Sequence, residues 1–134
     1  MTYEQTKVNV DFSLVGDDFN PEYISKMLKL EPTEVLKKGE FLIGRKIPNI
    51  ETTWSIQTGF EPSLDIKDQL IKIINQLIGK KEVLQKLCLE LPMRPVFQVT
   101  VLVKNQEIPV IYLDSIALEF ISSIGATIDI DIDV

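Results

Sequence analysis

The stretch Ala126-Thr127-Ile128-Asp129-Ile130-Asp131-Ile132-Asp133-Val134 alternates apolar and polar residues without interruption. Because successive side chains of a β-strand point to opposite faces of the sheet, this alternation predicts a strand with one buried face. We expect its isoleucines and Val134 to be buried, and its aspartates to lie in a row on the other face. The stretch therefore decides the fold class, since it requires a sheet that is covered on one face only.

Three other segments alternate in the same way and predict the rest of the sheet: residues 7–15, 52–60 and 97–103. The strands of a doubly wound sheet are covered on both faces, so they read as continuous apolar runs. The first and last predicted strands are instead polar on one side. We therefore expect two layers, with helices on one face of the sheet and solvent on the other.

Helices are predicted where a capping residue precedes apolar residues at helical spacing. Asn20 and Pro21 start the first helix, which continues to Glu31, because proline loses nothing at the first helical position. Residues 33–50 are the least regular, a loop with room for one short strand that pairs with the next segment. The other predicted helices are residues 64–78 between the cap Ser63 and the stop Gly79, 81–90 before Pro92 and Pro95, and 115–124 between the cap Asp114 and Gly125.

The order of these segments predicts an α+β fold and a single domain over residues 1–134. The sheet is expected to be mainly antiparallel, in a two-layer sandwich with the helices on one face. A strand, a helix and a strand occur twice, in residues 8–15, 21–29 and 52–59 and again in 97–103, 115–124 and 127–133. This repeat favours a ferredoxin-like plan of two split β-α-β units.

Charge and composition exclude several kinds of partner and chemistry. A net charge of −6 repels nucleic-acid phosphates. The chain has no histidine, the commonest general base and metal ligand, and its single cysteine allows neither an internal disulfide nor a thiolate cluster for zinc. We therefore expect no catalytic residues, no metal and no cofactor.

Neither a membrane nor an export route is expected. No apolar run approaches the ~20 residues that cross a bilayer. Residues 1–7 lack a charged segment followed by an apolar one, which a secretory signal would have. These features predict a cytoplasmic protein.

The first candidate site consists of Asp129, Asp131 and Asp133, joined by Asp11 from the polar side of the first strand. Alternate carboxylates along a strand lie ~6.5–7 Å apart, too far to share one ion. Their repulsion in water is only ~0.6 kcal/mol per adjacent pair, so the row is also explained by a solvated face that keeps the sheet soluble. If the row binds a partner, a basic protein suits it better than a metal.

The second candidate site is a basic region, with Lys37, Lys38, Arg45 and Lys46 as residues for binding an anion. No phosphate-loop motif accompanies them, so a solvated loop is the simpler interpretation. Trp54 lies on the same side of its strand as apolar residues, and we expect it in the core. Cys88 falls on the apolar stripe of its helix and is expected to pack as a small hydrophobe.

Several short motifs carry a resemblance to a known family through their order and spacing. They are Phe12–Gly16 followed by Phe19-Asn20-Pro21, Leu30-Glu31-Pro32-Thr33 followed by Lys37-Lys38-Gly39-Glu40, Thr53-Trp54 with Gln57-Thr58, and Gly125-Ala126-Thr127-Ile128-Asp129-Ile130-Asp131. Together they cover nearly the whole chain, which resembles a bacterial family of small acidic α+β domains of unknown function. The resemblance implies no activity, no cofactor and no site residues.

The function that we expect is a non-catalytic protein-binding module. In size and charge the chain is similar to immunity proteins, which neutralise a co-encoded toxin by covering its active site, so a basic, toxin-like partner is expected for an acidic surface. The alternatives are a small-molecule-binding regulatory domain and a hydrolase that uses paired carboxylates. We expect a monomer or a weak homodimer, because a closing strand at a sheet edge can pair with its copy.

Overall fold

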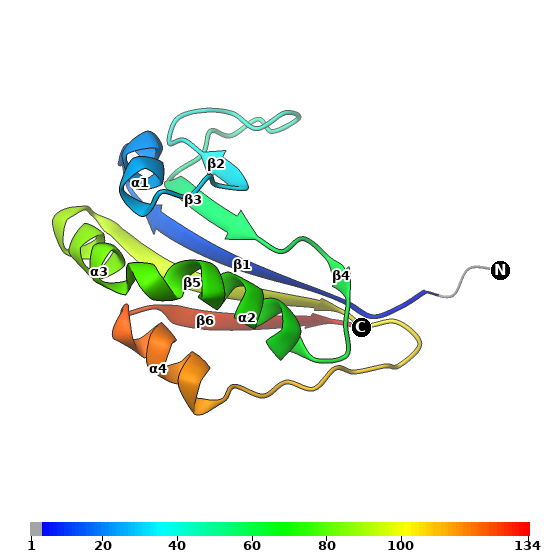
Figure 1. The fold of residues 1–134 in the computed structure, drawn as a ribbon. Helices are drawn as coiled ribbons and strands as arrows, with labels where there is room; N and C mark the ends of the chain where they lie inside the picture. The colour runs from blue at the N-terminus through cyan, green and yellow to red at the C-terminus, as the bar shows by residue number, and fades with distance from the viewer. Residues whose placement is uncertain (1–3) are drawn as a thin grey trace.

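A computed structural model describes residues 4–134, which form one sheet with helices on one side (Figure 1). The prediction of no secretory signal rests in part on residues 1–3, which lie outside the described residues. No helix in the described part of the chain is long and apolar enough to cross a membrane. The elements are β1 (Lys7–Gly16), α1 (Pro21–Leu28), β2 (Glu34–Leu36), β3 (Thr52–Gln57), β4 (Glu61–Pro62), α2 (Ile66–Leu77), the 3-10 turn η1 (Ile78–Lys80), α3 (Lys81–Glu90), β5 (Met93–Leu102), α4 (Ser115–Ser123) and β6 (Thr127–Asp133).

The sheet has the strand order β2-β3-β1-β5-β6, and the short β4 pairs with the start of β1. All paired strands are antiparallel except β5 and β6, which run parallel. The predicted α+β class with a mainly antiparallel sheet is therefore confirmed. The short strand expected in the irregular stretch is β2, which pairs with β3.

The ferredoxin-like plan of two split β-α-β units is wrong. The first half does contain a split unit, but the strand that runs parallel to β1 is β2. The predicted strand, β3, lies between the two and is antiparallel to both. In the second half, β5, α4 and β6 form a direct crossover, because β6 pairs with β5 itself. The sequence pattern of strand, helix and strand does not show whether another strand lies between the two strands of the unit. That depends on contacts between segments that are distant in sequence.

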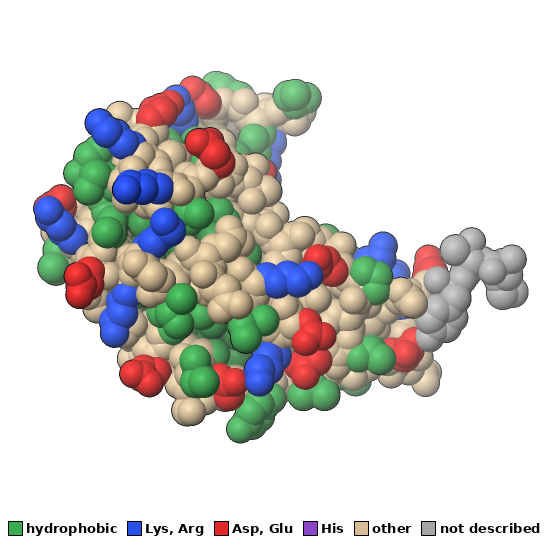
Figure 2. Space-filling model, viewed as in Figure 1, with side chains coloured by type: hydrophobic (Ala, Val, Ile, Leu, Met, Phe, Trp, Pro, Cys, Tyr) green, Lys and Arg blue, Asp and Glu red, His purple; other side chains and the backbone are tan. Residues whose placement is uncertain are grey.

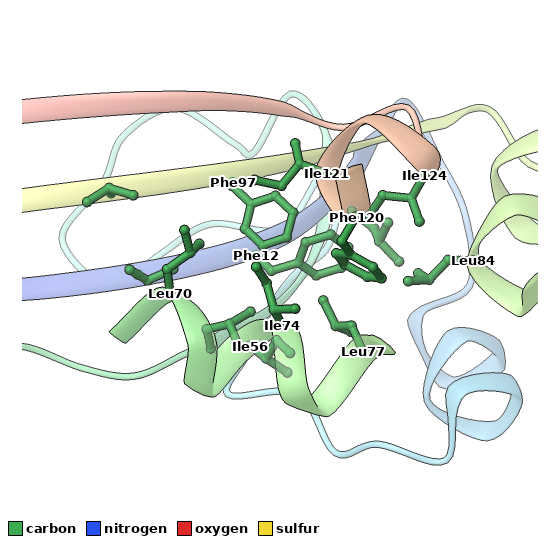
Figure 3. Packing of buried hydrophobic residues seen from close by; sticks show 14 of the residues in the cluster. Phe12, Ile56, Leu70, Ile74, Leu77, Leu84, Phe97, Phe120, Ile121 and Ile124 are labelled. Atoms are coloured by element: carbon green, nitrogen blue, oxygen red, sulfur yellow. The ribbon is translucent and has the colours of Figure 1, made fainter. Parts of the chain in front are cut away.

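The core lies between the helices and the apolar face of the sheet (Figure 3). Phe12 on β1 and Phe97 on β5 are opposite each other in register, with ring centroids 5.0 Å apart and ring planes inclined by 57°. Leu70 from α2 and Phe120 from α4 are buried over them. The central strands are therefore held by contacts with helices that lie far apart in the sequence.

Trp54 and Cys88 both belong to the core, as expected. Trp54 is fully buried, and its indole N–H donates to Ser25 Oγ at 3.0 Å, which ties β3 to α1. Cys88 is half-buried against the core, and burial raises the pKa of its thiol. A raised pKa keeps the thiol protonated at neutral pH and poorly nucleophilic.

β6 is less buried than its alternation predicts. Ile128 and Ile130 are half-buried against the core, but Ile132 is 46% exposed and Val134 is 92% exposed. The expectation that all these residues are buried is therefore wrong for the last part of the strand. The reason is its place at the edge of the sheet, where β5 is its only neighbouring strand in the described residues.

Most helix boundaries follow their local signals. Asn20 accepts from Glu22 N at 3.0 Å, Asp114 accepts from Ala117 N at 2.9 Å, and Gly125 ends α4 with φ +69°. α1 is shorter than predicted and ends at Leu28, because Lys29 takes the left-handed conformation with φ 55°.

Two predicted signals are wrong near α2. Asp65, and not Ser63, caps the helix by accepting from Lys67 N at 3.0 Å, while Ser63 makes hydrogen bonds within the preceding turn. Gly79 is not a left-handed stop, since it lies inside η1, which joins α2 to α3.

Pro95 was expected to lie outside the strand that follows α3, but it is part of β5 and pairs with Leu14. Proline is tolerated there because β6 begins to pair only at Val96, so no neighbour on that side needs the missing N–H.

Candidate functional site

The helices leave one face of the sheet exposed, and we call it the open face. In the described residues all helices lie on the other side (Figure 1). The strand pairing brings polar side chains from every long strand onto this face. The strand register places on it Lys7, Asn9, Asp11, Ser13 and Val15 from β1, Glu34 and Leu36 from β2, Thr53, Ser55 and Gln57 from β3, Arg94, Val96, Gln98, Thr100 and Leu102 from β5, and Thr127, Asp129, Asp131 and Asp133 from β6.

The strand register arranges these side chains in rows across the sheet. Asp11 lies opposite Gln57 on one side and Gln98 on the other, and Gln98 lies opposite Asp129. With neighbouring strands ~4.8 Å apart, Asp11 and Asp129 are separated by about 10 Å. The candidate aspartates therefore share one face, but they do not converge on one point.

Asp11 has the most altered environment of the carboxylates on the open face. It is half-buried, the Ser13 hydroxyl donates a hydrogen bond to it, and Ser13 Oγ lies 2.8 Å from Ser55 Oγ. Burial raises the pKa of Asp11, the hydrogen bond from Ser13 opposes this effect, and the negative charge of Glu34 adds to it. The ionised form of Asp11 is therefore unfavourable to the folded state.

Asp11→Asn is expected to stabilise the protein at pH 7 and to leave its stability unchanged near pH 3. Because folding raises the pKa, protonated Asp11 contributes stability below its unfolded pKa of ~3.9, and this contribution is lost as the pH rises through the folded pKa. Urea unfolding of both proteins at the two pH values measures the difference.

Ser13→Ala is the paired variant with the opposite expected sign. It removes the donor that favours ionised Asp11, so it should lower stability more at pH 7 than near pH 3. If wild type and Asp11→Asn were equally stable at both pH values, the assigned environment of Asp11 would be wrong.

The aspartates of β6 form a row along the edge of the sheet. Asp131 lies opposite Thr100 and Asp133 opposite Leu102, and all three aspartates are exposed. Among residues 4–134 no ion pair involves them. The row is therefore available to cationic groups from outside the chain.

A projecting segment borders the open face on the side of β2 and β3. Gly39 N donates to Asn49 O at 2.9 Å and Asn49 N donates to Glu40 O at 2.8 Å, which closes its base. We call residues 41–50 the apolar loop, because it exposes large apolar side chains while standing out from the body (Figure 2). These side chains are Phe41, Ile43, Ile47 and Ile50.

The apolar loop and the sheet enclose a hollow of about 370 Å³ on the open face. Leu36 and Thr53, which are paired across β2 and β3, lie on its sheet side. Arg45, Ile47 and Ile50 line it from the loop. This corner of the open face therefore combines exposed apolar side chains with charged ones such as Glu51, whereas the β6 side is acidic.

The structure divides the basic candidate residues into two pairs. Lys37 and Lys38 form ion pairs of 3.3 and 2.6 Å with Glu22 and Asp17. Arg45 lines the hollow, and Lys46, the next residue in the chain, is exposed. An anion bound by Lys37, Lys38, Arg45 and Lys46 would thus have to compete with carboxylates for the two lysines that form ion pairs.

Further hollows lie among other elements. One of about 370 Å³ is lined by residues that include Asp68 and Glu107, and one of about 150 Å³ lies between α2 and α4. Within the described residues no three His, Cys, Asp or Glu side chains are grouped so that they could hold a metal ion.

Sequence reasoning missed Glu34 and the exposure of the apolar loop. Glu34 reaches the open face through a strand of three residues, which is too short to show an alternation. The apolar run Phe41-Leu42-Ile43 was a visible signal, but a short apolar run is also typical of a buried strand. Only its exposure in the folded chain separates the two cases.

A comparison with known protein families matches residues 5–134 to the family described as Domain of unknown function (DUF4279). The matched region includes the whole open face and the apolar loop. The family resemblance predicted from the sequence motifs is thereby confirmed. No curated protein and no solved structure matches the chain.

Proposed function

We propose, on the premise that this chain belongs to the DUF4279 family of domains of unknown function, that it is a non-catalytic protein-binding module. The open face would contact the partner, and the partner would be basic. One observation carries the proposal: an exposed sheet face lies between an apolar loop on one side and, on the other, a row of aspartates that form no ion pair with residues 4–134.

The apolar loop favours binding over a face that serves only solubility. A solubilising face needs polar side chains, and it gains nothing from a projection that exposes Phe41, Ile43 and Ile47. Leaving apolar surface in water costs about 25 cal/mol per Å² that burial by a partner would recover. Protein interfaces combine an apolar centre with a polar rim, and the exposed apolar side chains of the loop with the neighbouring polar rows offer both.

Charge defines the kind of partner. The aspartates of β6 would interact most favourably with a surface rich in lysine and arginine. Complementary charge of this kind speeds association and makes it depend on salt. As the specific role we propose an immunity protein, which would cover a basic site on a co-encoded toxin.

Combined substitution of Asp129, Asp131 and Asp133 by asparagine is expected to slow association with the partner about tenfold at low salt. The reason is the loss of the charges that steer a basic surface to this side of the sheet. The partner is first recovered from the source cells with the tagged full chain and purified. Its association rate is then measured between about 50 and 200 mM salt, where the variant should show a flatter dependence.

The matched control removes the same charge from the helical side of the molecule. Asp68→Asn, Glu82→Gln and Glu119→Gln are combined, because these exposed residues lie on α2, α3 and α4. The control should associate nearly as fast as wild type. Equal losses in both triple variants would mean a general charge effect, and no loss in the β6 variant would reject the open face as the contact.

A small-molecule-binding regulatory domain is the second candidate, favoured by the hollow between α2 and α4. Ile74, Ile78 and Ile116 line it, and Lys67 and Asp114 form a 3.2 Å ion pair at its rim. Its volume of about 150 Å³ lies below the ~300–1,000 Å³ of most ligand pockets, which is why we rank it second. A thermal-shift screen against nucleotides and anionic metabolites tests it, because a saturating ligand raises the unfolding temperature.

A further inference from the structure

β6 ends the sheet on one side, and part of its backbone has no hydrogen-bond partner in the described part of the chain. Val103 N donates to Asp133 O at 2.8 Å, so the backbone groups of the β6 aspartates point toward β5. Since consecutive residues of a strand direct their N–H and C=O groups to opposite sides, Ile128, Ile130 and Ile132 direct theirs outward. Within residues 4–134 these outward groups make no hydrogen bond.

This edge is long enough to take another strand. β6 spans seven residues, whereas β2 at the opposite edge spans three. The half-buried Ile128 and Ile130 and the exposed Ile132 would be covered further by side chains of an added strand. An edge of this length that pairs with no further strand in the described residues is a template for pairing with another chain.

The aspartates decide which chain can pair. In an antiparallel pair of two copies, the aspartates of both β6 strands fall on the same face and lie directly opposite one another, with Cβ atoms ~4.5–5.5 Å apart. Like charges in that position destabilise the pair. A strand with lysine or arginine at alternate positions places opposite charges there instead, so the edge selects a basic strand over a second copy.

The far end of β6 offers the added strand an apolar contact. A hollow of about 370 Å³ is lined there by Val103, Ile108 and Val134, together with Asn105 and Gln106 of the turn that follows β5. Val134, the residue that follows β6, belongs to its lining. An apolar side chain at the end of the incoming strand would fit into it.

We infer that β6 is a docking edge that adds one antiparallel strand from a basic protein partner. Lysine or arginine side chains of that strand lie beside Asp129, Asp131 and Asp133, and its apolar side chains lie on the helical side beside the isoleucines. This inference rests on the proposed function and specifies its contact, since the partner extends the sheet through backbone hydrogen bonds.

Two synthetic peptides with capped ends test the inference on the full chain. The first is Lys-Val-Lys-Val-Lys-Val-Lys, and the second, Lys-Lys-Val-Val-Val-Lys-Lys, has the same composition and charge without the alternation. We expect the alternating peptide to bind about tenfold more tightly, because only it can present its lysines on one face of a strand. Binding is measured by titration monitored with NMR.

Amide hydrogen exchange locates the contact. The N–H groups of Ile128, Ile130 and Ile132 should exchange quickly in the free chain and about tenfold more slowly with the alternating peptide. The N–H groups of Asp129 and Asp131 already donate within the sheet and serve as internal controls.

Ile130→Pro removes one outward donor and keeps the hydrogen bonds between β6 and β5, because proline is tolerated on the free side of an edge strand. It should weaken binding of the alternating peptide about tenfold. Ile130→Val keeps the N–H and should bind like wild type. If Ile130→Pro does not fold, the exchange measurement on the wild-type chain still decides the question.

The outcomes separate this inference from the proposed function. Equal binding of both peptides, or binding without protection of the isoleucine amides, would overturn the docking edge and leave a basic partner on the open face. Failure of both peptides to bind, together with normal partner association by the triple asparagine variant, would reject the two proposals together. A wild-type dimer with protected isoleucine amides would show that a second copy occupies the edge.

Discussion

Phe12→Ala is expected to lower the free energy of unfolding by about 3–5 kcal/mol. Phe12 has 0% exposure, it lies on the central strand β1, and its ring contacts the ring of Phe97. The substitution loses the buried area of the ring and the aromatic contact, and it leaves a cavity that the strands on both sides cannot close. Urea unfolding followed by the fluorescence of Trp54 gives the value.

Phe41→Ala is the matched control, because the same side chain is removed from an exposed position. Phe41 is 60% exposed on the apolar loop. Its loss should change the free energy of unfolding by less than about 0.5 kcal/mol. If both variants lost similar stability, the apolar loop would be part of the core and not a contact surface.

Gly16→Ala is expected to cost about 3 kcal/mol, at the upper end of the usual penalty for overpacking. A Cβ atom at Gly16 would lie 2.1 Å from Pro92 O and 3.0 Å from Met93 Cα, and both atoms belong to the backbone. No rotamer change can relieve that contact, so the start of β5 would have to move away from β1. The measurement is the midpoint of urea unfolding.

Gly79→Ala is the control for this prediction. Gly79 lies in η1, and an added Cβ would meet nothing within 4 Å. Alanine restricts the unfolded chain, so this variant should be about 0.5–1 kcal/mol more stable than wild type. A neutral Gly16→Ala would mean that β1 and the chain before β5 are farther apart than the structure places them.

The elements that local chemistry controls were predictable from the sequence. Asn20 and Asp114 cap helices through bonds to residues two or three positions on, and Gly125 ends a helix by its own backbone angle. Ser63 failed as a cap because Asp65 lies close by and supplies a competing oxygen to the first turn of α2. Choices between neighbouring caps depend on where the helix docks, and sequence alone does not contain that information.

Of the candidate site, only the residues on its strands could be predicted from the sequence. Alternation placed Asp11 on the open face together with the aspartates of β6, because side-chain direction in a strand has a period of two residues. The apolar loop was not predictable, since residues 41–50 have no period and their exposure follows from the chain around them. The pairing of Lys37 and Lys38 with carboxylates near α1 was hidden for the same reason.

The sequence by itself determined that Asp129, Asp131 and Asp133 share one face of a strand and that isoleucines occupy the other, because strand geometry is local. Only the tertiary structure decided that β6 lies at the edge of the sheet, parallel to β5 and next to no other strand in the described residues. Strand order depends on which distant segments bury their apolar faces together, and the alternation is the same for an inner strand as for an outer one. That position leaves the outward backbone groups of Ile128, Ile130 and Ile132 without a hydrogen bond among residues 4–134.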